Sequence, residues 1–313
     1  MTYRDKGGNM YHFGYDAKGN LTRVYGPLGF SRQMSYNDKG WLLTSTDANG
    51  NVSSMTYNLD GTVAEIMNAA GDVSSLSYDT YGNCIAISDF KNNVTRMDYD
   101  RNRRLTTVVD AMGKSSRYSY DKVGNLVRMI DAKGRIQAYT YDANGNLLTS
   151  IGPDGSKDEL EYDKKGNVIC ITSTGDRKTY VNWNSSGYVS SVINAEGETV
   201  KYTYDLNGNL SKVTNPNGNV VNYVYDELGR VLKISDNIGV IAEYTYDYGN
   251  RPTDVIDAAS NRMKYSYDAL GRLVSTKMPS GSTVTYEYDN NSNLLSVIDG
   301  NGNRTEKTYS SLN

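Results

Sequence analysis

The stretch Tyr141-Asp142-Ala143-Asn144-Gly145-Asn146-Leu147 returns in recognisable form every 21 residues along this chain. An aromatic residue holds the same register from residue 15 to residue 309, with no insertion or deletion between copies. A fixed period of this length is the sequence signature of a repeat architecture. A length of 313 residues would otherwise suggest one or two domains, but an array grows in one direction and need not divide.

Each unit can be numbered from its aromatic residue, which we call position zero. Residues 1–14 then form a partial unit, residues 15–308 form fourteen full units and residues 309–313 begin another, so a single array over residues 1–313 is predicted. Position four is Gly in eleven of the fourteen full units. The residues predicted to be structural marks of the repeat are Tyr15, Tyr36, Tyr57, Tyr78, Tyr99, Tyr120, Tyr141, Tyr162, Trp183, Tyr204, Tyr225, Tyr246, Tyr267 and Tyr288, with the glycines Gly19, Gly124, Gly145, Gly208, Gly229 and Gly271.

Two turns are predicted in every unit. Asp142-Ala143-Asn144-Gly145 covers positions one to four, and Asp47-Ala48-Asn49-Gly50 shows the same pattern at positions eleven to fourteen. The side chain of the first residue can accept a backbone N–H two residues on, and the Gly can take the positive φ that closes the turn. We call these the position-one turn and the position-eleven turn, and both resemble common hairpin connections.

Two turns imply two strands per unit. In residues 136–141 aromatic and small polar side chains alternate, which favours a strand with one buried face. The second strand, near residues 146–150, has its apolar side chains at positions six and nine, which have opposite parity. A β-bulge after the Gly would explain this, and so would partial burial of both faces. We therefore predict an all-β array of about fifteen antiparallel β-hairpins, paired edge to edge in one continuous sheet that must twist and curl.

The aromatic composition bears on the faces of this sheet. The chain has 28 Tyr residues against three Phe, although a dry core would favour Phe, Leu and Val. A Tyr hydroxyl needs water or a hydrogen-bond partner. The bias suggests an amphipathic face, such as the lining of a wide hydrated cavity, and the alternative is that the hydroxyls protrude at the rim of the sheet.

Charge and hydropathy argue against several classes of protein. The net charge is −3 and the basic residues form no stripe, so no nucleic-acid partner is expected. No apolar run approaches 18 residues, so no membrane span is expected. The polar residues 1–10 contain no secretory signal peptide. Cys84 and Cys170 lie at different positions of their units and are expected to remain thiols.

Candidate catalytic and metal-binding residues are few. His12 is the only histidine and falls at a polar position, so we expect it on the surface and expect no enzyme active site built on His. The carboxylates of Asp100, Asp121, Asp142 and Asp163 recur in register and could in principle hold Ca²⁺. Their spacing matches no calcium-binding loop, and their place at the start of a turn explains them without metal. No catalytic, cofactor or metal site is therefore predicted.

The unit Tyr141-Asp142-x-x-Gly145-Asn146-Leu147, preceded by Asp131-x-x-Gly134 and Tyr139, resembles the YD repeat of the RHS family. The resemblance extends over essentially the whole chain. The family includes RHS polymorphic toxins, wall-associated proteins, the C components of Tc toxin complexes and teneurins. The Asp-Pro-containing autoproteolysis segment that usually ends the core of RHS toxins is missing, since none of the five Pro residues follows Asp.

This resemblance implies a β-hairpin strip wound into a partial or whole hollow shell. It implies a non-enzymatic scaffold, secreted or at the cell surface, that encapsulates or presents a toxin or effector domain. Its partners would be that domain or further repeat segments of the same system. The alternative is a carbohydrate-binding or adhesion module, because Tyr, Asn and Asp on a long curved sheet could bind surface glycans. Unpaired strands at the two ends predict end-to-end self-association.

Overall fold

The computed structural model describes residues 1–312 and contains thirty β-strands in a single antiparallel sheet. Each strand pairs with the next strand in the sequence, as two central examples, β14 with β15 and β15 with β16, illustrate. One short 3₁₀ turn, η1 (Pro27–Gly29), interrupts the pattern. The predicted all-β array of about thirty strands in one continuous sheet is confirmed.

Even-numbered strands run into the aromatic residue of position zero, apart from the last, which ends three residues before it. They are β2 (Met10–Tyr15), β4 (Ser31–Tyr36), β6 (Val52–Tyr57), β8 (Val73–Tyr78), β10 (Val94–Tyr99), β12 (Ser115–Tyr120), β14 (Ile136–Tyr141), β16 (Lys157–Tyr162), β18 (Arg177–Trp183), β20 (Thr199–Tyr204), β22 (Val220–Tyr225), β24 (Val240–Tyr246), β26 (Arg262–Tyr267), β28 (Thr283–Tyr288) and β30 (Arg304–Glu306).

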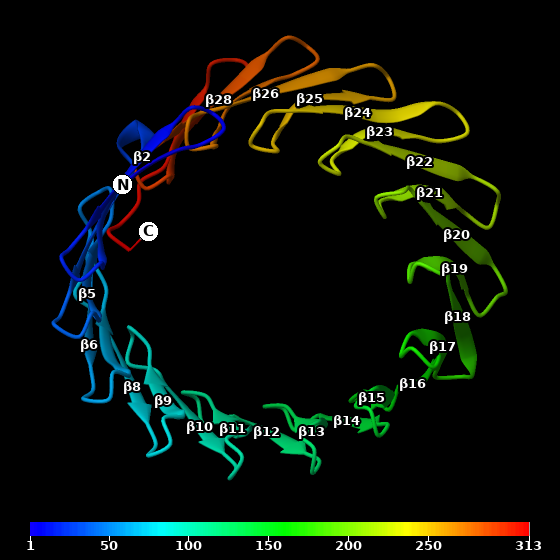
Figure 1. Ribbon diagram of the computed structural model, residues 1–313, viewed down its shortest axis with the longest axis horizontal. Coiled ribbons are helices and arrows are strands. Elements are labelled where there is room, and N and C mark those ends of the chain that lie inside the picture. Colours follow the sequence, from blue (N-terminus) through cyan, green and yellow to red (C-terminus); the bar gives the residue numbers. More distant parts are fainter. Residues whose placement is uncertain (313) are drawn as a thin grey trace.

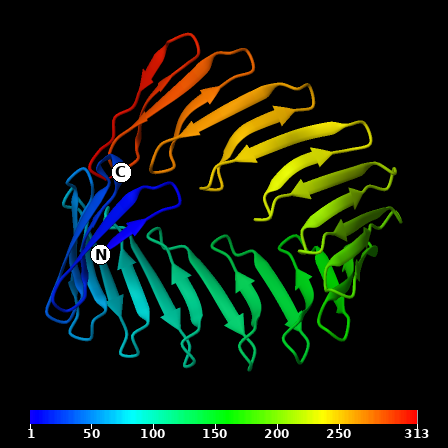
Figure 2. The same cartoon turned by 45° about the horizontal axis from the view of Figure 1, so that its top comes forward.

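Odd-numbered strands after the first begin at position six. They are β1 (Thr2–Arg4), β3 (Leu21–Tyr25), β5 (Leu42–Thr46), β7 (Val63–Met67), β9 (Cys84–Ser88), β11 (Leu105–Val109), β13 (Leu126–Ile130), β15 (Leu147–Ile151), β17 (Val168–Ser173), β19 (Val189–Ile193), β21 (Leu210–Thr214), β23 (Val231–Ser235), β25 (Pro252–Asp257), β27 (Leu273–Lys277) and β29 (Leu294–Ile298). Figure 2 shows that the turns between strands collect along the two edges of the strip. We call these edges the position-one rim and the position-eleven rim.

A β-bulge explains the apolar pattern of the second strand. Tyr141 pairs with Leu147, but Thr140 pairs with Thr149, so Leu148 has no residue opposite it. The same shift recurs next to the position-zero residue in the units before and after. The extra residue reverses side-chain parity between positions six and nine, because successive side chains of a strand point to opposite faces. Of the two explanations for this strand, the bulge is confirmed.

The sheet is a single layer, with no second sheet or helix covering it in the described part of the chain. Its accessible surface is 19581 Å², whereas a compact protein of this mass would expose about 13,000 Å². Cys170 and Ala242 are the only buried hydrophobic residues among residues 1–312. Stability must therefore come from the main-chain ladder, from half-buried side chains and from side-chain hydrogen bonds to the backbone.

The strip curves into a ring, and its two ends come to lie beside each other (Figure 1). The ring does not close by strand pairing, since within residues 1–312 β1 pairs only with β2 and β30 only with β29. The last units instead lie beside the first ones, rim to rim. The sheet is thus a superhelix that slightly exceeds one full turn.

Candidate functional site

The position-zero column joins each unit to the one before it. Thirteen of its residues, from Tyr36 to Tyr309, donate a side-chain O–H or N–H to the backbone carbonyl of position six in the preceding unit, at 2.7–3.0 Å. Trp183 replaces Tyr in one unit and uses its indole N–H, 2.8 Å from the Val168 oxygen. This hydrogen bond explains why the column holds Tyr or Trp and not Phe. The hydroxyls of this column thus meet a carbonyl, a partner that the sequence did not reveal.

Asp side chains close most of the position-one turns, and Asn holds this place at Asn37, Asn58 and Asn184. Oδ1 of Asp142 accepts the backbone N–H groups of Asn144 and Asn146, both at 2.8 Å, and its Oδ2 accepts the Asn146 amide, also at 2.8 Å. These bonds, first the one from the Asn146 side chain, hold the pKa of the Asp142 carboxyl below its usual value. The same arrangement is present at Asp163 and Asp205. The turn carboxylates are therefore fixed structural acceptors.

Some units carry Arg in place of the Asn that follows the turn, and this Arg reaches the next unit. In one such unit, Arg272 donates Nε–H to Asp268 at 2.6 Å and Nη1–H to the Asp289 backbone oxygen at 2.7 Å. Its guanidinium also lies 4.8 Å from the ring centre of Tyr288. Arg104, Arg230 and Arg251 make the same contact with the ring of the following unit. Each clamp adds a charge-assisted contact between neighbouring hairpins at the rim.

The turn glycines adopt the left-handed conformation. Gly145 and Gly208 both have φ of 86°, which confirms the predicted positive φ. Where position four is not Gly, the replacing residue takes the same conformation, with φ of 62° at Arg103 and 71° at Ser292. The backbone geometry of the turn is therefore kept even where the side chain makes it strained.

Stacked turn carboxylates do not gather into a metal site. Both oxygens of Asp100, Asp121, Asp142 and Asp163 accept N–H groups of their own turns. Across residues 1–312, no three His, Cys, Asp or Glu side chains are grouped so that they could hold a metal ion. The turn geometry accounts for the column that suggested Ca²⁺.

The remaining candidate residues lie apart from one another. His12 is exposed on β2, as predicted. Cys84 and Cys170 are free thiols, which agrees with the expectation from their spacing. In the described portion of the chain, no helix has the length and apolar character needed to cross a membrane.

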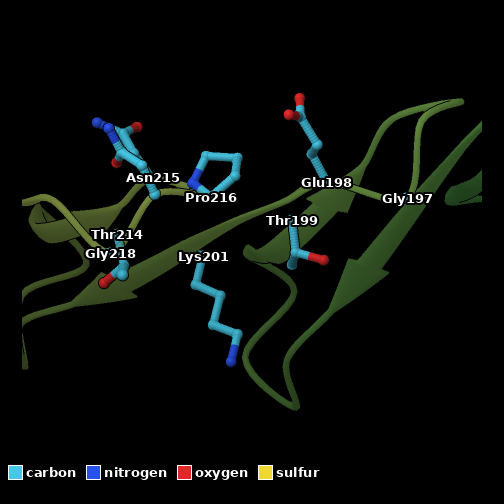
Figure 3. Close-up of a pocket in the computed structure, with 9 residues that line it drawn as sticks. Gly197, Glu198, Thr199, Lys201, Thr214, Asn215, Pro216 and Gly218 are labelled. Atoms are coloured by element: carbon cyan, nitrogen blue, oxygen red, sulfur yellow. The ribbon is translucent and has the colours of Figure 1, made fainter.

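A surface hollow lies between two position-eleven turns, at the ends of β20 and β21. Its lining is Gly197, Glu198, Thr199, Lys201, Thr214, Asn215, Pro216, Asn217 and Gly218. Figure 3 shows that the Glu198 and Lys201 side chains point in opposite directions, so that no set of polar groups converges on one point. The hollow is the ordinary space between neighbouring turns and not a built binding site.

The start of the second superhelical turn meets the first turn at a seam between unlike rims. Asn291, in a position-one turn, donates Nδ2–H to Asp47 at 2.6 Å and accepts the backbone N–H of Ala48 at 3.0 Å. In return, Asn49 donates to Asp289 at 2.9 Å. Further along the seam, Asn9 donates to the Ala269 backbone oxygen at 3.1 Å. Residues 240 or more positions apart are thus tied together, a feature that no local sequence pattern predicted.

These observations define the class of protein, a superhelical array of β-hairpins whose units are tied through side-chain hydrogen bonds. A family model described as the teneurin YD-shell matches residues 95–257, just over half of the chain, and one described as the RHS repeat matches residues 15–52, 250–283 and 267–305. The chain belongs to the YD-repeat, or RHS-repeat, family, as its sequence resemblance predicted. A search of the curated proteins finds no significant match.

Several solved structures share the fold. The chain superposes on the crystal structure of TcdB2-TccC3-TEV with a TM-score of 0.62 at 16% identity, covering 93% of this chain and 20% of that one. It superposes on TcdB2-TccC3 without its hypervariable C-terminal region with a TM-score of 0.52 at 14% identity, covering 93% of this chain and 22% of that one. For the Photorhabdus luminescens Tc holotoxin pore the TM-score is 0.51 at 14% identity, with 95% of this chain and 21% of that one covered. The chain spans about a fifth of the length of these solved chains, and at such identities the likeness shows the fold alone.

Proposed function

We propose that this chain is a non-enzymatic scaffold, a segment of an RHS/YD shell that encapsulates or presents a toxin or effector domain outside the cell or at its surface. The observation that carries the proposal is the seam, where the curved strip meets itself rim to rim after one superhelical turn. A wall whose successive turns adhere to one another can enclose a space, whereas an isolated curved sheet cannot.

The construction of the wall supports this role. Main-chain pairing connects each hairpin to its neighbour along the whole strip, and position-zero hydrogen bonds in thirteen places and Arg clamps in some units reinforce it. Units twelve or thirteen apart meet at the seam, so one turn contains about 25 strands and, at ~4.8 Å per strand, has a circumference of roughly 120 Å. The backbone-to-backbone width is then about 40 Å, several times the 10–12 Å diameter of a helix. A polypeptide segment could be accommodated inside.

The comparisons with known families and solved structures support the same function. The matching family models describe a shell and a repeat. The structural neighbours come from TcdB2-TccC3 complexes and from a Tc holotoxin pore, and by analogy this chain would act with further components of a toxin system. The lone exposed His12 and the turn-bound carboxylates give a scaffold role more support than a catalytic one.

Protease protection tests the proposal. Any non-repeat segment that the natural gene encodes beside this array would be produced together with the array and alone, and both samples would be treated with a non-specific protease. We expect cleavage of that segment to be slowed in the presence of the array. Equal cleavage in the two samples would contradict encapsulation. Sugar-specific retention on a glycan array, with no protection, would favour the adhesion alternative.

A further inference from the structure

The contacts along the seam follow a constant offset in the number of units. The unit that starts at residue 288 places Asn291 on Asp47, in the unit twelve places earlier, and its Asn290 lies against Gly29, thirteen places earlier. A Cβ added at Gly29 would lie 2.8 Å from Asn290 Oδ1. Each position-one turn of the second superhelical turn therefore sits between two position-eleven turns of the first. Ser311 and Leu312 extend the same pattern, since they line one hollow with Asn68 and Ala69.

Apolar side chains of the position-one turns differ in exposure along the rim, and at the seam Tyr248 and Leu312 are still 62% and 55% exposed. Leu270, at position three of a seam turn, is half-buried. Leu228, at the same position two units earlier, is 65% exposed, and Val123 is 85% exposed. Leu59 and Leu206, at position two, are exposed almost completely. These exposed aliphatic side chains lie on the same rim that forms the seam, so they are available to a partner that repeats the seam contacts.

The position-eleven rim also carries exposed apolar side chains. Phe90, Met112 and Ile238 stand in position-eleven turns that the seam does not reach, and Met112 and Ile238 are exposed by 75% and 95%. The two free rims are thus the same two kinds of surface that the seam already joins. They face opposite ends of the superhelix, because each seam contact joins a position-one turn of the later units to a position-eleven turn of the earlier ones.

We propose that a second copy of this chain docks its free position-one rim, with Leu59, Val123, Leu206 and Leu228, onto the free position-eleven rim of the first copy. The docked copy continues the superhelix and repeats the seam contacts between molecules. The interface joins unlike surfaces, so it does not close, and it generates head-to-tail oligomers. It does not depend on any enclosed cargo, and it is distinct from the pairing of the end strands, which buries none of these side chains.

Sedimentation velocity over a range of concentrations tests the proposal on the full chain. The rim variant carries Leu206→Ser and Leu228→Ser, at two side chains that are 107% and 65% exposed. The control is Val224→Ser, which removes a half-exposed apolar side chain from β22, in the middle of the sheet between the two substituted residues. Circular dichroism checks that all three proteins keep the same sheet content.

We expect the unmodified chain to associate reversibly, the rim variant to raise the apparent dissociation constant about tenfold or more, equivalent to ~1.4 kcal/mol, and the control to leave it within about twofold. Three results would overturn the proposal: a monomeric unmodified chain at every concentration, a rim variant that associates as strongly as the unmodified chain, or a control that weakens association to the same degree. The second result would point to end-strand pairing alone.

Discussion

The hydrogen bond of the position-zero column can be tested within one strand. Tyr225 and Tyr223 both lie on β22 as half-buried residues two positions apart, and so on the same face. The Tyr225 hydroxyl donates to the Leu210 backbone oxygen at 2.8 Å. Burial raises the pKa of the Tyr225 hydroxyl above its ordinary value. The Tyr223 hydroxyl makes no such inter-unit bond to position six. Comparing Phe substitutions at the two residues therefore separates the effect of the hydrogen bond from the effect of the aromatic ring.

We predict that Tyr225→Phe destabilises the array by about 1 kcal/mol, the net value of one neutral hydrogen bond that leaves its acceptor unsatisfied. Tyr223→Phe should change stability by less than ~0.3 kcal/mol by the same reasoning. Because repeat arrays unfold in segments, hydrogen exchange of the β21 and β22 amides is the better assay. Exchange should accelerate roughly fivefold in Tyr225→Phe only. Equal acceleration in both variants would refute the structural role of the hydroxyl.

Further predictions concern the turns, the seam and pH. Arg103→Gly should stabilise the protein to denaturant by about 1 kcal/mol because it relieves a left-handed φ, whereas Arg101→Gly in the same turn should not. Asn291→Ala should lower thermal stability by about 1–2 kcal/mol by breaking two seam hydrogen bonds, and Asn144→Ala, at the same position away from the seam, should be near neutral. The pKa values of turn carboxyls such as Asp142 are lower in the folded than in the unfolded state. The contribution of these carboxylates to folding stability is therefore complete above the unfolded-state pKa of about 4. It is lost as pH falls through the folded-state pKa. Melting temperature should drop below about pH 4, and less steeply in Asp142→Asn; a profile that is flat down to pH 3 would count against these turn bonds.

Much of the fold could be predicted from the sequence because its determinants are local. In a turn such as residues 142–145 the Asp and Gly act within five residues, and the alternation before Tyr141 reports one face of a strand. The bulge was one of two predicted explanations, since parity alone does not distinguish a bulge from burial on both faces. The pairing of Thr140 with Thr149 decides between them.

The sequence did not predict two sets of contacts, the position-zero hydrogen bonds and the seam, because the 21-residue period does not specify them. In the thirteen position-zero bonds the acceptor is a backbone carbonyl 15 residues earlier, and a carbonyl leaves no mark in the sequence. Nothing at Asn291 distinguishes it from Asn144, yet only Asn291 reaches a turn of the preceding superhelical turn. The seam depends on the accumulated curvature of the sheet over twelve units, and small angles between strands add up in a way that no single motif specifies.

The most direct test of the account is a pair of deletions near the middle of the array. Removal of residues 142–162 takes out one complete unit, so every later strand, turn and hydroxyl keeps its partner type. Removal of residues 142–151 takes out one strand, which sends all later position-one turns to the opposite rim. We predict that the first protein keeps a cooperative melt and protected amides throughout the sheet, and that the second loses protection beyond the deletion. Equal behaviour of the two proteins would contradict a 21-residue hairpin as the unit of this structure.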